Sequence, residues 1–438
     1  MIRIIIIFIL IIACISIFLY PYIPVIIYYA FAILQPQEVW FWACADLRVS
    51  FVPAVASIIA FIIQLSKGIE FKLIKHKELI CMILLWLWMW LSTFWGAYPV
   101  RSYGMPTTNA GWILEYSNKM FIMAIIATYL IRERIALKLL VLSLILVTIY
   151  LIYWGNMQYI TGAMYRCNIL GRLNGPYNPA QGGAGVYTES NCFATLYVCM
   201  LPFLYGFFQY FKKIYFKIGI LLIIILGWHC VFLTGSRGGL VGLVVTLMVL
   251  ILRSKKKLWG VLLLVVLYLF FLWQGGALMK KRAGTIENYK TDKSAEERIV
   301  SWGLALKMMH DHPFFGVGLG NFIMARAKYG DPERLCTMST PLQYGAECGI
   351  PAMLFFIGSI AFSILNLDKL RRFLLKRNME EKDVSDLLAI LNGLESSLIG
   401  YTVCGIFLSL LVFEPYMMLI ALICILKNIV REELGVIT

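Results

Sequence analysis

The sequence predicts an all-α polytopic membrane protein with about twelve transmembrane helices and one long outer loop that contains short amphipathic helices. Of its 438 residues, 61% are hydrophobic and 14% are charged, and the mean hydropathy is +0.80. A water-soluble fold has no core large enough for that much apolar surface. Apolar runs recur along the whole chain, and each crossing of a bilayer takes about 20 apolar residues. These observations exclude a soluble enzyme with a single membrane anchor.

Twelve apolar runs predict the transmembrane helices. The first run is long for one span and contains Pro21 and Pro24. It is therefore either one kinked, tilted helix or two short ones, and thirteen spans are the alternative count. The run continues too far for a signal peptide, and no small-residue cleavage site follows it. In chain order the runs cover residues 3–34, 50–65, 78–98, 111–131, 135–154, 190–211, 215–234, 238–252, 258–274, 346–367, 384–412 and 415–430.

Lysine and arginine set the predicted orientation. Basic connections alternate with connections that are nearly free of lysine, and the positive-inside rule places the basic ones in the cytoplasm. The chain then divides into transmembrane helices 1 to 9 with short loops at residues 1–274, an outer loop at 275–345, and helices 10 to 12 with a cytoplasmic C-terminus at 346–438. The first four basic connections carry Lys67, Lys72, Lys75 and Lys77, then Arg132, Arg134 and Lys138, then Lys212, Lys213 and Lys217, then Arg253 and Lys255 to Lys257.

The formal net charge of +15 reflects this topology and contact with anionic membrane lipids. Nucleic-acid binding would need the charges on one soluble face, and they are scattered over many loops. No nucleic acid is therefore expected as a partner. Within the outer loop, apolar residues at helical spacing predict short helices that lie against the membrane surface, and these residues are Ile299, Trp302, Leu306 and Met309.

No metal and no cofactor are expected. The eleven cysteines contain no C-x-x-C pair, and the sole close histidine pair, His310 and His312, lacks the i, i+4 spacing of a helical zinc site. Cys44, Cys167 and Cys336 fall on the predicted outer side, where they could oxidise, but the sequence does not say which of them would pair.

Two arginines on the predicted outer face are candidates for a binding site. Arg237 lies in a Gly-Ser-Arg-Gly-Gly run between two apolar runs, so it must lie at the membrane boundary. It belongs either to a tight helical hairpin whose arginine reaches lipid headgroups or to an anion clamp, because its planar fork and the N–H groups of the next helix suit a diphosphate. Arg298 follows Glu296 and Glu297, and it marks either a solvated helix start or a second contact to the same site.

Four motifs in series resemble the O-antigen ligase/polymerase superfamily. They are Thr234-Gly-Ser-Arg-Gly-Gly, Glu297-Arg-Ile-Val-Ser-Trp302, His312-Pro-Phe-Phe-Gly-Val-Gly-Leu-Gly-Asn-Phe322 and Leu342-Gln-Tyr-Gly-Ala-Glu-Cys-Gly349. The motifs match the superfamily individually, and so do their order and spacing. The resemblance spans most of the chain. The upstream segments are similar to the putative O-glycosylation ligases found with exosortase systems, and these segments are Gln35-Pro36, Gly175-Pro176 and Glu189-Ser-Asn191.

The resemblance implies a glycosyltransferase of the bacterial cytoplasmic (inner) membrane whose active site faces outward and lies partly on the 275–345 loop. Members of the superfamily take a glycan from an undecaprenyl diphosphate carrier and pass it to a lipid, a growing glycan or a protein, typically with inversion and without a required metal. By this likeness Arg237 and Arg298 hold the diphosphate and stabilise it as leaving group, and a histidine removes the acceptor proton. Ligase and polymerase share these motifs and differ in the acceptor, and we favour a ligase.

The sequence departs from the superfamily at that histidine. Counting back nine residues from Glu347, where the superfamily commonly has His-Asn or His-Ser, gives Met338-Ser339. Methionine cannot accept a proton, so another group takes the role, the register differs by a few residues, or the transfer activity has changed. Glu347 is one candidate base, and it is equally suited to cap or pair at the start of the next span.

Other polar residues have a structural alternative. Lys119 forms a charge pair with Glu115 at i, i+4, or it helps to bind the carrier diphosphate, since superfamily members often carry a lysine in this span. Arg166 and Arg172 brace the outer loop or contact glycan, and the resemblance adds Asn191 as a substrate-binding residue.

The histidines and a buried acid are better explained by structure. If one helix runs from Arg298 to His310, the two residues are about 18 Å apart at 1.5 Å per residue. His312 precedes a proline, which favours a structural role, and His229 and Glu395 are expected to pack or hydrogen-bond within the bundle.

The competing function class is a transporter or flippase for a lipid-linked glycan. It would need intramembrane polar residues along a path through the bilayer. The unusual charges of this chain collect on one face instead, and this favours the glycosyltransferase.

Overall fold

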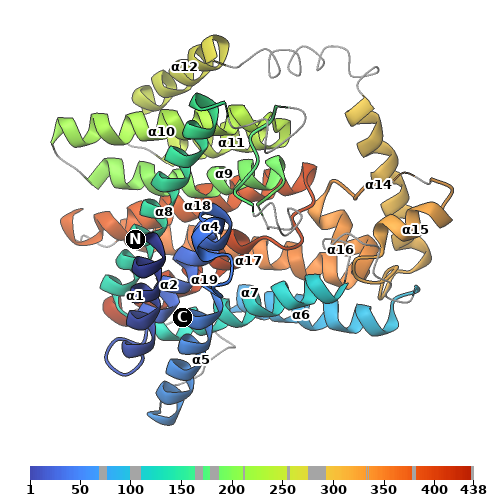
Figure 1. Ribbon diagram of the computed structural model, residues 1–438, viewed down its shortest axis with the longest axis horizontal. Coiled ribbons are helices and arrows are strands. Elements are labelled where there is room, and N and C mark those ends of the chain that lie inside the picture. The colour runs from blue at the N-terminus through green and yellow to red at the C-terminus, as the bar shows by residue number, and fades with distance from the viewer. Residues whose placement is uncertain are drawn as a thin grey trace.

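The described structure is built from helices. The computed structural model describes residues 1–68, 76–98, 110–162, 171–177, 187–210, 213–253, 257–274, 293–331, 333, 335–376 and 381–435. Within these ranges it contains helices and no strand, as the sequence predicts (Figure 1). The helices are α1 (Ile2–Ile15), α2 (Ile23–Leu34), α3 (Pro36–Val39), α4 (Phe41–Cys44), α5 (Phe51–Ser66), α6 (Lys77–Trp95), α7 (Ala110–Leu130), α8 (Arg134–Ile160), α9 (Ser190–Tyr210), α10 (Ile214–Thr234), α11 (Arg237–Arg253), α12 (Lys257–Gln274), α14 (Lys293–Asp311), α15 (Phe322–Lys328), α16 (Thr340–Cys348), α17 (Ile350–Lys376), α18 (Glu381–Phe407) and α19 (Glu414–Leu434).

Among the described residues, five helices are long and apolar enough to cross a membrane, by length and composition. They are α6, α8, α10, residues Ile350–Leu375 of α17 and residues Val384–Phe407 of α18. Shorter apolar helices cover Ile2–Ile15, Phe51–Ser66 and Gly260–Trp273. The chain is therefore a multi-pass membrane protein, and the count of twelve spans stays a prediction.

The first apolar run forms two short helices, which decides between the two alternatives that the sequence left open. α1 ends at Ile15, and α2 begins at Ile23 with Pro24 in its first turn, where a proline needs no N–H partner. With 14 and 12 residues, the two helices are about 21 and 18 Å long at 1.5 Å per residue. Each is therefore shorter than the hydrocarbon core of a bilayer, which is about 30 Å thick.

α18 is central to the packing of the C-terminal half, because it contacts α9, α11, α17 and α19. Small residues let its backbone approach α11 closely. A Cβ atom on Gly242 of α11 would lie 2.3 Å from Cys404 Sγ, and one on Gly400 of α18 would lie 2.1 Å from Thr246 Oγ1. This small-residue packing, common between membrane helices, holds the start of α11 beside the end of α18.

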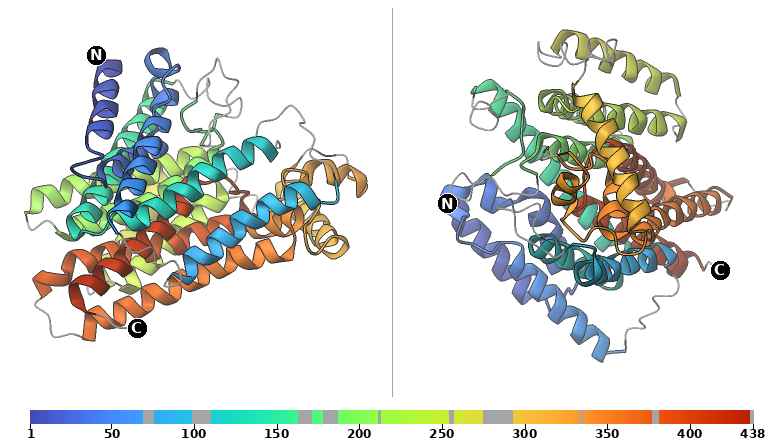
Figure 2. Two further views of the ribbon diagram at one scale, coloured as in Figure 1. Left: turned by 90° about the horizontal axis from the view of Figure 1, so that it is seen from below. Right: turned by 90° about the vertical axis from the view of Figure 1, so that its right-hand side faces the viewer.

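The long predicted loop contributes helices of its own. α14, α15 and α16 lie together at one end of the long axis of the molecule, whereas α1, α2 and α5 lie on one flank and α10 to α12 on the other (Figures 1 and 2). The three loop helices share a small apolar core that is separate from the main one and includes Leu304, Met308, Val317, Phe322 and Ala346.

The run predicted to begin the tenth span at residue 346 is interrupted. α16 ends at Cys348, Gly349 has a φ of +89°, and α17 begins at Ile350. Glycine adopts this φ without strain, and a Cβ at this position would lie 2.1 Å from the main-chain oxygen of Phe314. α16 therefore belongs with the loop helices rather than with the span.

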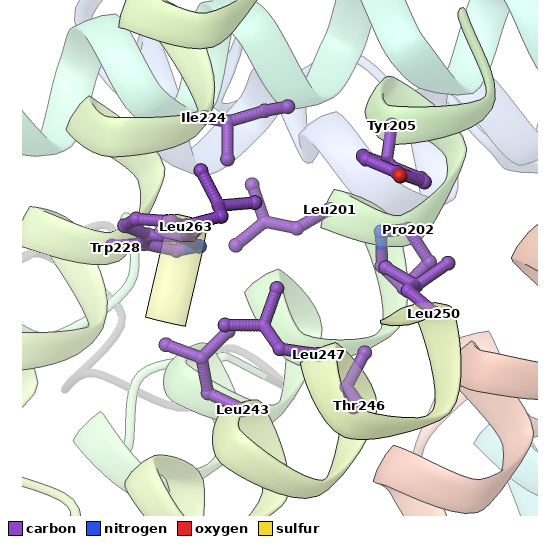
Figure 3. Close-up of a pocket in the computed structure, with 10 residues that line it drawn as sticks. All are labelled: Leu201, Pro202, Tyr205, Ile224, Trp228, Leu243, Thr246, Leu247, Leu250 and Leu263. Atoms are coloured by element: carbon purple, nitrogen blue, oxygen red, sulfur yellow. The ribbon is translucent and has the colours of Figure 1, made fainter. Parts of the chain in front are cut away.

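A small pocket lies among α9, α10, α11 and α12 (Figure 3). Its lining is mainly apolar and includes Leu201, Leu243, Leu247 and Leu263, with the ring of Trp228 at one side. Such a lining offers few polar partners for a glycan, and we assign the pocket no role in transfer.

Candidate active site

Arg237 begins α11 after a turn of two residues. α10 ends at Thr234, and Gly235 has a φ of +61°, which glycine tolerates. Ser236 caps the next helix, because its Oγ accepts the N–H of Gly239 at 3.1 Å. The half-buried Arg237 therefore stands at a helix start, where N–H groups and the helix dipole favour an anion.

Arg172 holds this turn in place. Its Nε donates to the main-chain oxygen of Thr234 at 2.7 Å, and the neighbouring Leu173 N–H donates to the oxygen of Leu233 at 2.9 Å. These contacts correspond to the bracing alternative for Arg172. Arg166, the other arginine predicted in this loop, lies outside the described residues.

Asn191 connects Arg172 with an acidic side chain that sequence reasoning did not assign a role. An Nη atom of Arg172 donates to Asn191 Oδ1 at 3.3 Å, and Asn191 Nδ2 donates to Glu189 Oε1 at 2.6 Å. Glu189 is exposed. The Glu-Ser-Asn motif could have indicated Glu189 as a functional residue, but the sequence does not show which side chains contact it.

The end of α18 brings the two predicted arginines to one region. A Cβ on Gly238, next to Arg237, would lie 3.4 Å from Phe407 Cβ. The ring of Trp302, one turn after Arg298 on α14, lies 6.4 Å from the ring of Phe407 between centroids. Each arginine is thus within about one turn of a residue that packs against the same phenylalanine.

Met338, where the count from Glu347 predicts the superfamily histidine, lies beside the same segment. Its N–H donates to Ser409 Oγ at 3.0 Å, two residues after Phe407. Met338 has a φ of +54°, a conformation that is rare for residues other than glycine and in which Asn, Asp and His are enriched. The backbone at this position therefore has a conformation that a histidine would tolerate better than most side chains.

The start of α14 is fixed by a buried arginine of α15. Arg326 donates to Ser301 Oγ at 2.6 Å and pairs with Asp331 at 2.7 Å. This pairing holds the pKa of Asp331 below its usual value. Ser301 lies one turn after Glu297 and donates to its main-chain oxygen at 2.7 Å. These contacts fix the segment of α14 that carries Arg298, whose Nε atom is buried.

Glu347 lies in the interior, and we revise its predicted role as a base. Its side chain is 2% exposed, Oε2 accepts the N–H of Gly320 at 2.9 Å, and Oε1 accepts from Gln343 Nε2 at 3.1 Å. Burial raises the pKa of this carboxyl to about 7. Because both oxygens are engaged by the protein, Glu347 positions the glycine-rich loop, which corresponds to the pairing alternative considered from sequence.

Lys119 lies on a different group of helices. Its Nζ is 2.6 Å from Glu115 Oε1 and 5.1 Å from the ring centre of Tyr116, so the predicted i, i+4 pair is present. α7 packs against α2, α5, α6 and α19. These are not the helices that carry the two arginines.

The histidines occupy structural or remote positions. α14 is continuous from Lys293 to Asp311, so the expected separation of about 18 Å between Arg298 and His310 holds at 1.5 Å per residue. The ring of His312 packs edge-on against that of Tyr98 at 6.0 Å. His229 is buried, with Nδ1 2.8 Å from Asn156 Oδ1.

At the opposite end of α11 the basic residues form ion pairs with carboxylates. Arg253 Nε lies 3.1 Å from Glu395 Oε2, and Arg371 also pairs with Glu395. Arg134 and Lys138 both pair with Asp386. Residues from two of the predicted cytoplasmic connections are therefore tied into the helix bundle.

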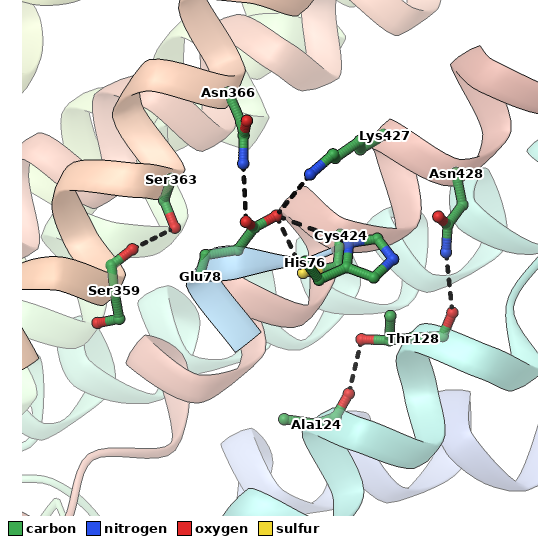
Figure 4. A network of polar contacts seen from close by, with 10 residues as sticks. All are labelled: His76, Glu78, Ala124, Thr128, Ser359, Ser363, Asn366, Cys424, Lys427 and Asn428. Carbon is green, nitrogen blue, oxygen red and sulfur yellow. Dashed lines mark hydrogen bonds and ion pairs between the residues drawn. The ribbon is translucent and has the colours of Figure 1, made fainter. Parts of the chain in front are cut away.

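One buried cluster at the start of α6 has metal-ligand atom types (Figure 4). His76, Glu78 and Cys424 each offer one atom within 4.8 Å of the others. However, Asn366 donates to Glu78 Oε2 at 2.7 Å, and Lys427 Nζ lies 3.6 Å from Oε1. Because Lys427 already supplies positive charge, we interpret the cluster as a buried ion-pair network.

Two family matches cover most of the chain. Residues 220–357 match the family described as O-Antigen ligase, and residues 1–212 match a family of unknown function, DUF5935. The first match includes Arg237, Arg298, Met338 and Glu347. No curated protein matches this chain.

Proposed function

The chain belongs to the O-antigen ligase superfamily, and on this premise we propose that it transfers a glycan from an undecaprenyl diphosphate carrier to an acceptor. The transfer takes place at the outer face of the bacterial cytoplasmic (inner) membrane, among anionic lipids, and the acceptor is a lipid, a glycan or a protein. Ligase chemistry is favoured over polymerase chemistry, in keeping with the description of the matched family.

One observation carries the proposal. Arg237 at the start of α11 and Arg298 on α14 come from segments 61 positions apart in the sequence, and both lie beside the end of α18 through Gly238 and Trp302. An arginine fork suits the oxygens of a diphosphate, and the start of α11 adds N–H donors to the same anion.

The proposed reaction needs electrostatic stabilisation at this position. As the bond between the sugar C1 and the phosphate oxygen breaks, negative charge builds up on the diphosphate leaving group. Well-placed donors stabilise such charge by a few kcal/mol each, about 3 kcal/mol in measured cases. Two arginines and a helix start supply this stabilisation from the protein's own groups, and we propose a metal-independent displacement that inverts the anomeric centre.

A direct assay tests the proposal. Purified protein in lipid nanodiscs would be incubated with an undecaprenyl diphosphate glycan and with lipid, glycan and peptide acceptors in separate reactions. The expected result is free undecaprenyl diphosphate together with a glycosylated acceptor, both measured by mass spectrometry.

The outcomes separate the candidate functions. Elongation of the carrier-linked glycan would make the protein a polymerase. Movement of the carrier-linked glycan across the bilayer of liposomes, without release of undecaprenyl diphosphate in any reaction, would replace the enzyme with a transporter.

A further inference from the structure

Glu189 precedes α9 at the end of the molecule that holds the two arginines. Its main-chain oxygen accepts the N–H of Phe193 at 3.0 Å, so Glu189 occupies the N-cap position of α9. The side chain is exposed. One carboxylate oxygen, Oε1, accepts from Asn191 Nδ2 at 2.6 Å, and the other, Oε2, lies 3.9 Å from the thiol of Cys192, a weak donor.

A chain of hydrogen bonds fixes Glu189 relative to the turn that carries Arg237. Asn191 accepts from Arg172 at 3.3 Å, and Arg172 donates to Thr234 at 2.7 Å, three residues before Arg237. The two helix starts also touch, because a Cβ on Gly239 of α11 would lie 2.7 Å from Ala194 Cβ of α9.

Glu189 also lies near the segment that contains Met338. Burial raises the pKa of the Cys336 thiol, and the nearby Glu189 carboxylate is the next cause. Cys336 precedes Met338 by two residues, and Met338 bonds to Ser409 beside the end of α18. The starts of α9 and α11 and the end of α18 thus place Glu189 in the same region as the turn of Arg237 and the segment of Met338.

We propose that Glu189 is the general base of the transfer reaction, in the place of the histidine that this chain lacks at Met338. The inference rests on the proposed function and adds to it the group that activates the acceptor. A carboxylate can remove a hydroxyl proton during the displacement, and among the described residues Oε2 lies against the weak donor Cys192. Glu347, in contrast, is buried with both oxygens engaged.

The acceptor hydroxyl oxygen forms a bond to the sugar C1, and its proton passes to Glu189. The bond from C1 to the phosphate oxygen breaks, and its electron pair leaves with undecaprenyl diphosphate, held by the arginines. Glu189 then returns its proton to water, and the site is ready for a second turnover.

The test compares Glu189→Gln with the parental protein using two acceptors. Glutamine keeps an oxygen for the Asn191 contact but cannot accept the proton. With a hydroxyl acceptor the variant should lose about 100-fold or more of the rate, the usual contribution of a general base. Azide is an anion with no proton to remove, so the variant should form glycosyl azide at the parental rate.

Two further variants distinguish catalysis from structure. Glu333→Gln alters an exposed acid of the 275–345 loop and should leave both rates unchanged. Adding Met338→His to Glu189→Gln should restore part of the hydroxyl transfer, because histidine supplies a base where the backbone already suits it.

Negative results for Glu189 and for the transferase activity would lead to different conclusions. Parental hydroxyl transfer by Glu189→Gln, or an equal loss with azide and with the hydroxyl acceptor, would overturn the role of Glu189 and leave the transferase intact. Absence of carrier release by the parental protein with every acceptor would overturn the proposed function and the base together.

Discussion

The two ends of α11 use arginine differently. At the site end, which comprises the starts of α9 and α11 and the end of α18, Arg172 is held by a main-chain oxygen and by the neutral side chain of Asn191. At the opposite end, Arg253 and Arg371 share the carboxylate of Glu395. At the site end these contacts hold the turn that carries Arg237. At the opposite end the arginines tie α11, α17 and α18 together through one carboxylate.

The largest expected effect is on stability at the opposite end. Arg371 is 8% exposed, and removing one member of a buried ion pair costs about 3 to 5 kcal/mol. Arg371→Ala should lower the free energy of unfolding by that amount, measured by denaturant titration in detergent, and should leave transfer per folded molecule unchanged. The matched control is Arg372→Ala, whose exposed pair with Asp368 should be worth about 1 kcal/mol or less. Equal losses for the two variants would contradict a structural role for the Glu395 pairs.

The next effect is on transfer at the site end. Arg237→Ala and Arg298→Ala should each cost about 2 to 4 kcal/mol of transition-state stabilisation, and lysine should rescue only part because it lacks the planar fork. Rates and carrier binding would both be measured, with the exposed Arg3→Ala as control. A parental rate for Arg298→Ala would remove α14 from the site and leave Arg237 alone.

A smaller effect concerns the pH dependence of stability. Glu347 is buried like Glu395 at the opposite end, but its described contacts include no cationic partner. Its pKa is about 7 in the folded protein against an ordinary value of 4.5. Between these values the folded carboxyl keeps a proton that the unfolded one has lost, so stability falls as pH rises and levels off about one pH unit above the folded pKa.

This dependence can be measured. From pH 5.5 to 7 the contribution of Glu347 should fall by about 2 kcal/mol, at 1.36 kcal/mol per unit. Glu347→Gln should remove this slope from the pH profile of the unfolding free energy. An unchanged slope in the variant would assign the titration to another group.

The smallest effect tests whether the two ends face opposite sides of the membrane. Cysteines replacing the exposed residues Glu333 and Ser385 should leave stability almost unchanged, since surface substitutions usually stay within about 0.5 kcal/mol. Glu333→Cys should react with an impermeant thiol reagent from the outer side and Ser385→Cys should not. The reverse pattern, measured against the parental cysteines, would invert the predicted orientation.

Local patterns in the sequence predicted the helices better than the contacts between them. The Gly-Ser-Arg-Gly-Gly run was enough to place Arg237 at a tight turn, because a turn of this kind depends on the local backbone and not on distant contacts. The prolines near residue 21 suit both a kink and a break, so the choice of two helices needed the structure. The break at Gly349 was missed because the hydropathy of the run continues through it.

The site was predicted only in part for a similar reason. Arg237 and Arg298 could be named from their motifs, but their common neighbour Phe407 carries no polar signal. Glu347 was one candidate base because it lies nine residues past the predicted histidine position, at the start of the predicted tenth span. Its burial depends on the N–H of Gly320, 27 positions earlier in the chain, and periodicity does not reveal such long-range partners.

The turn of two residues between α10 and α11 also constrains how the protein enters the membrane. Helices joined so closely insert together as a hairpin, so in the predicted orientation Arg237 must cross the bilayer during synthesis. Moving an arginine to the bilayer centre costs about 2.5 to 3.5 kcal/mol on insertion scales, and positive charge resists export. Lys213, Lys217 and Arg253 at the other ends of the hairpin outnumber it and keep the hairpin oriented. Biogenesis therefore limits how much positive charge this turn can carry, independently of what the diphosphate would favour.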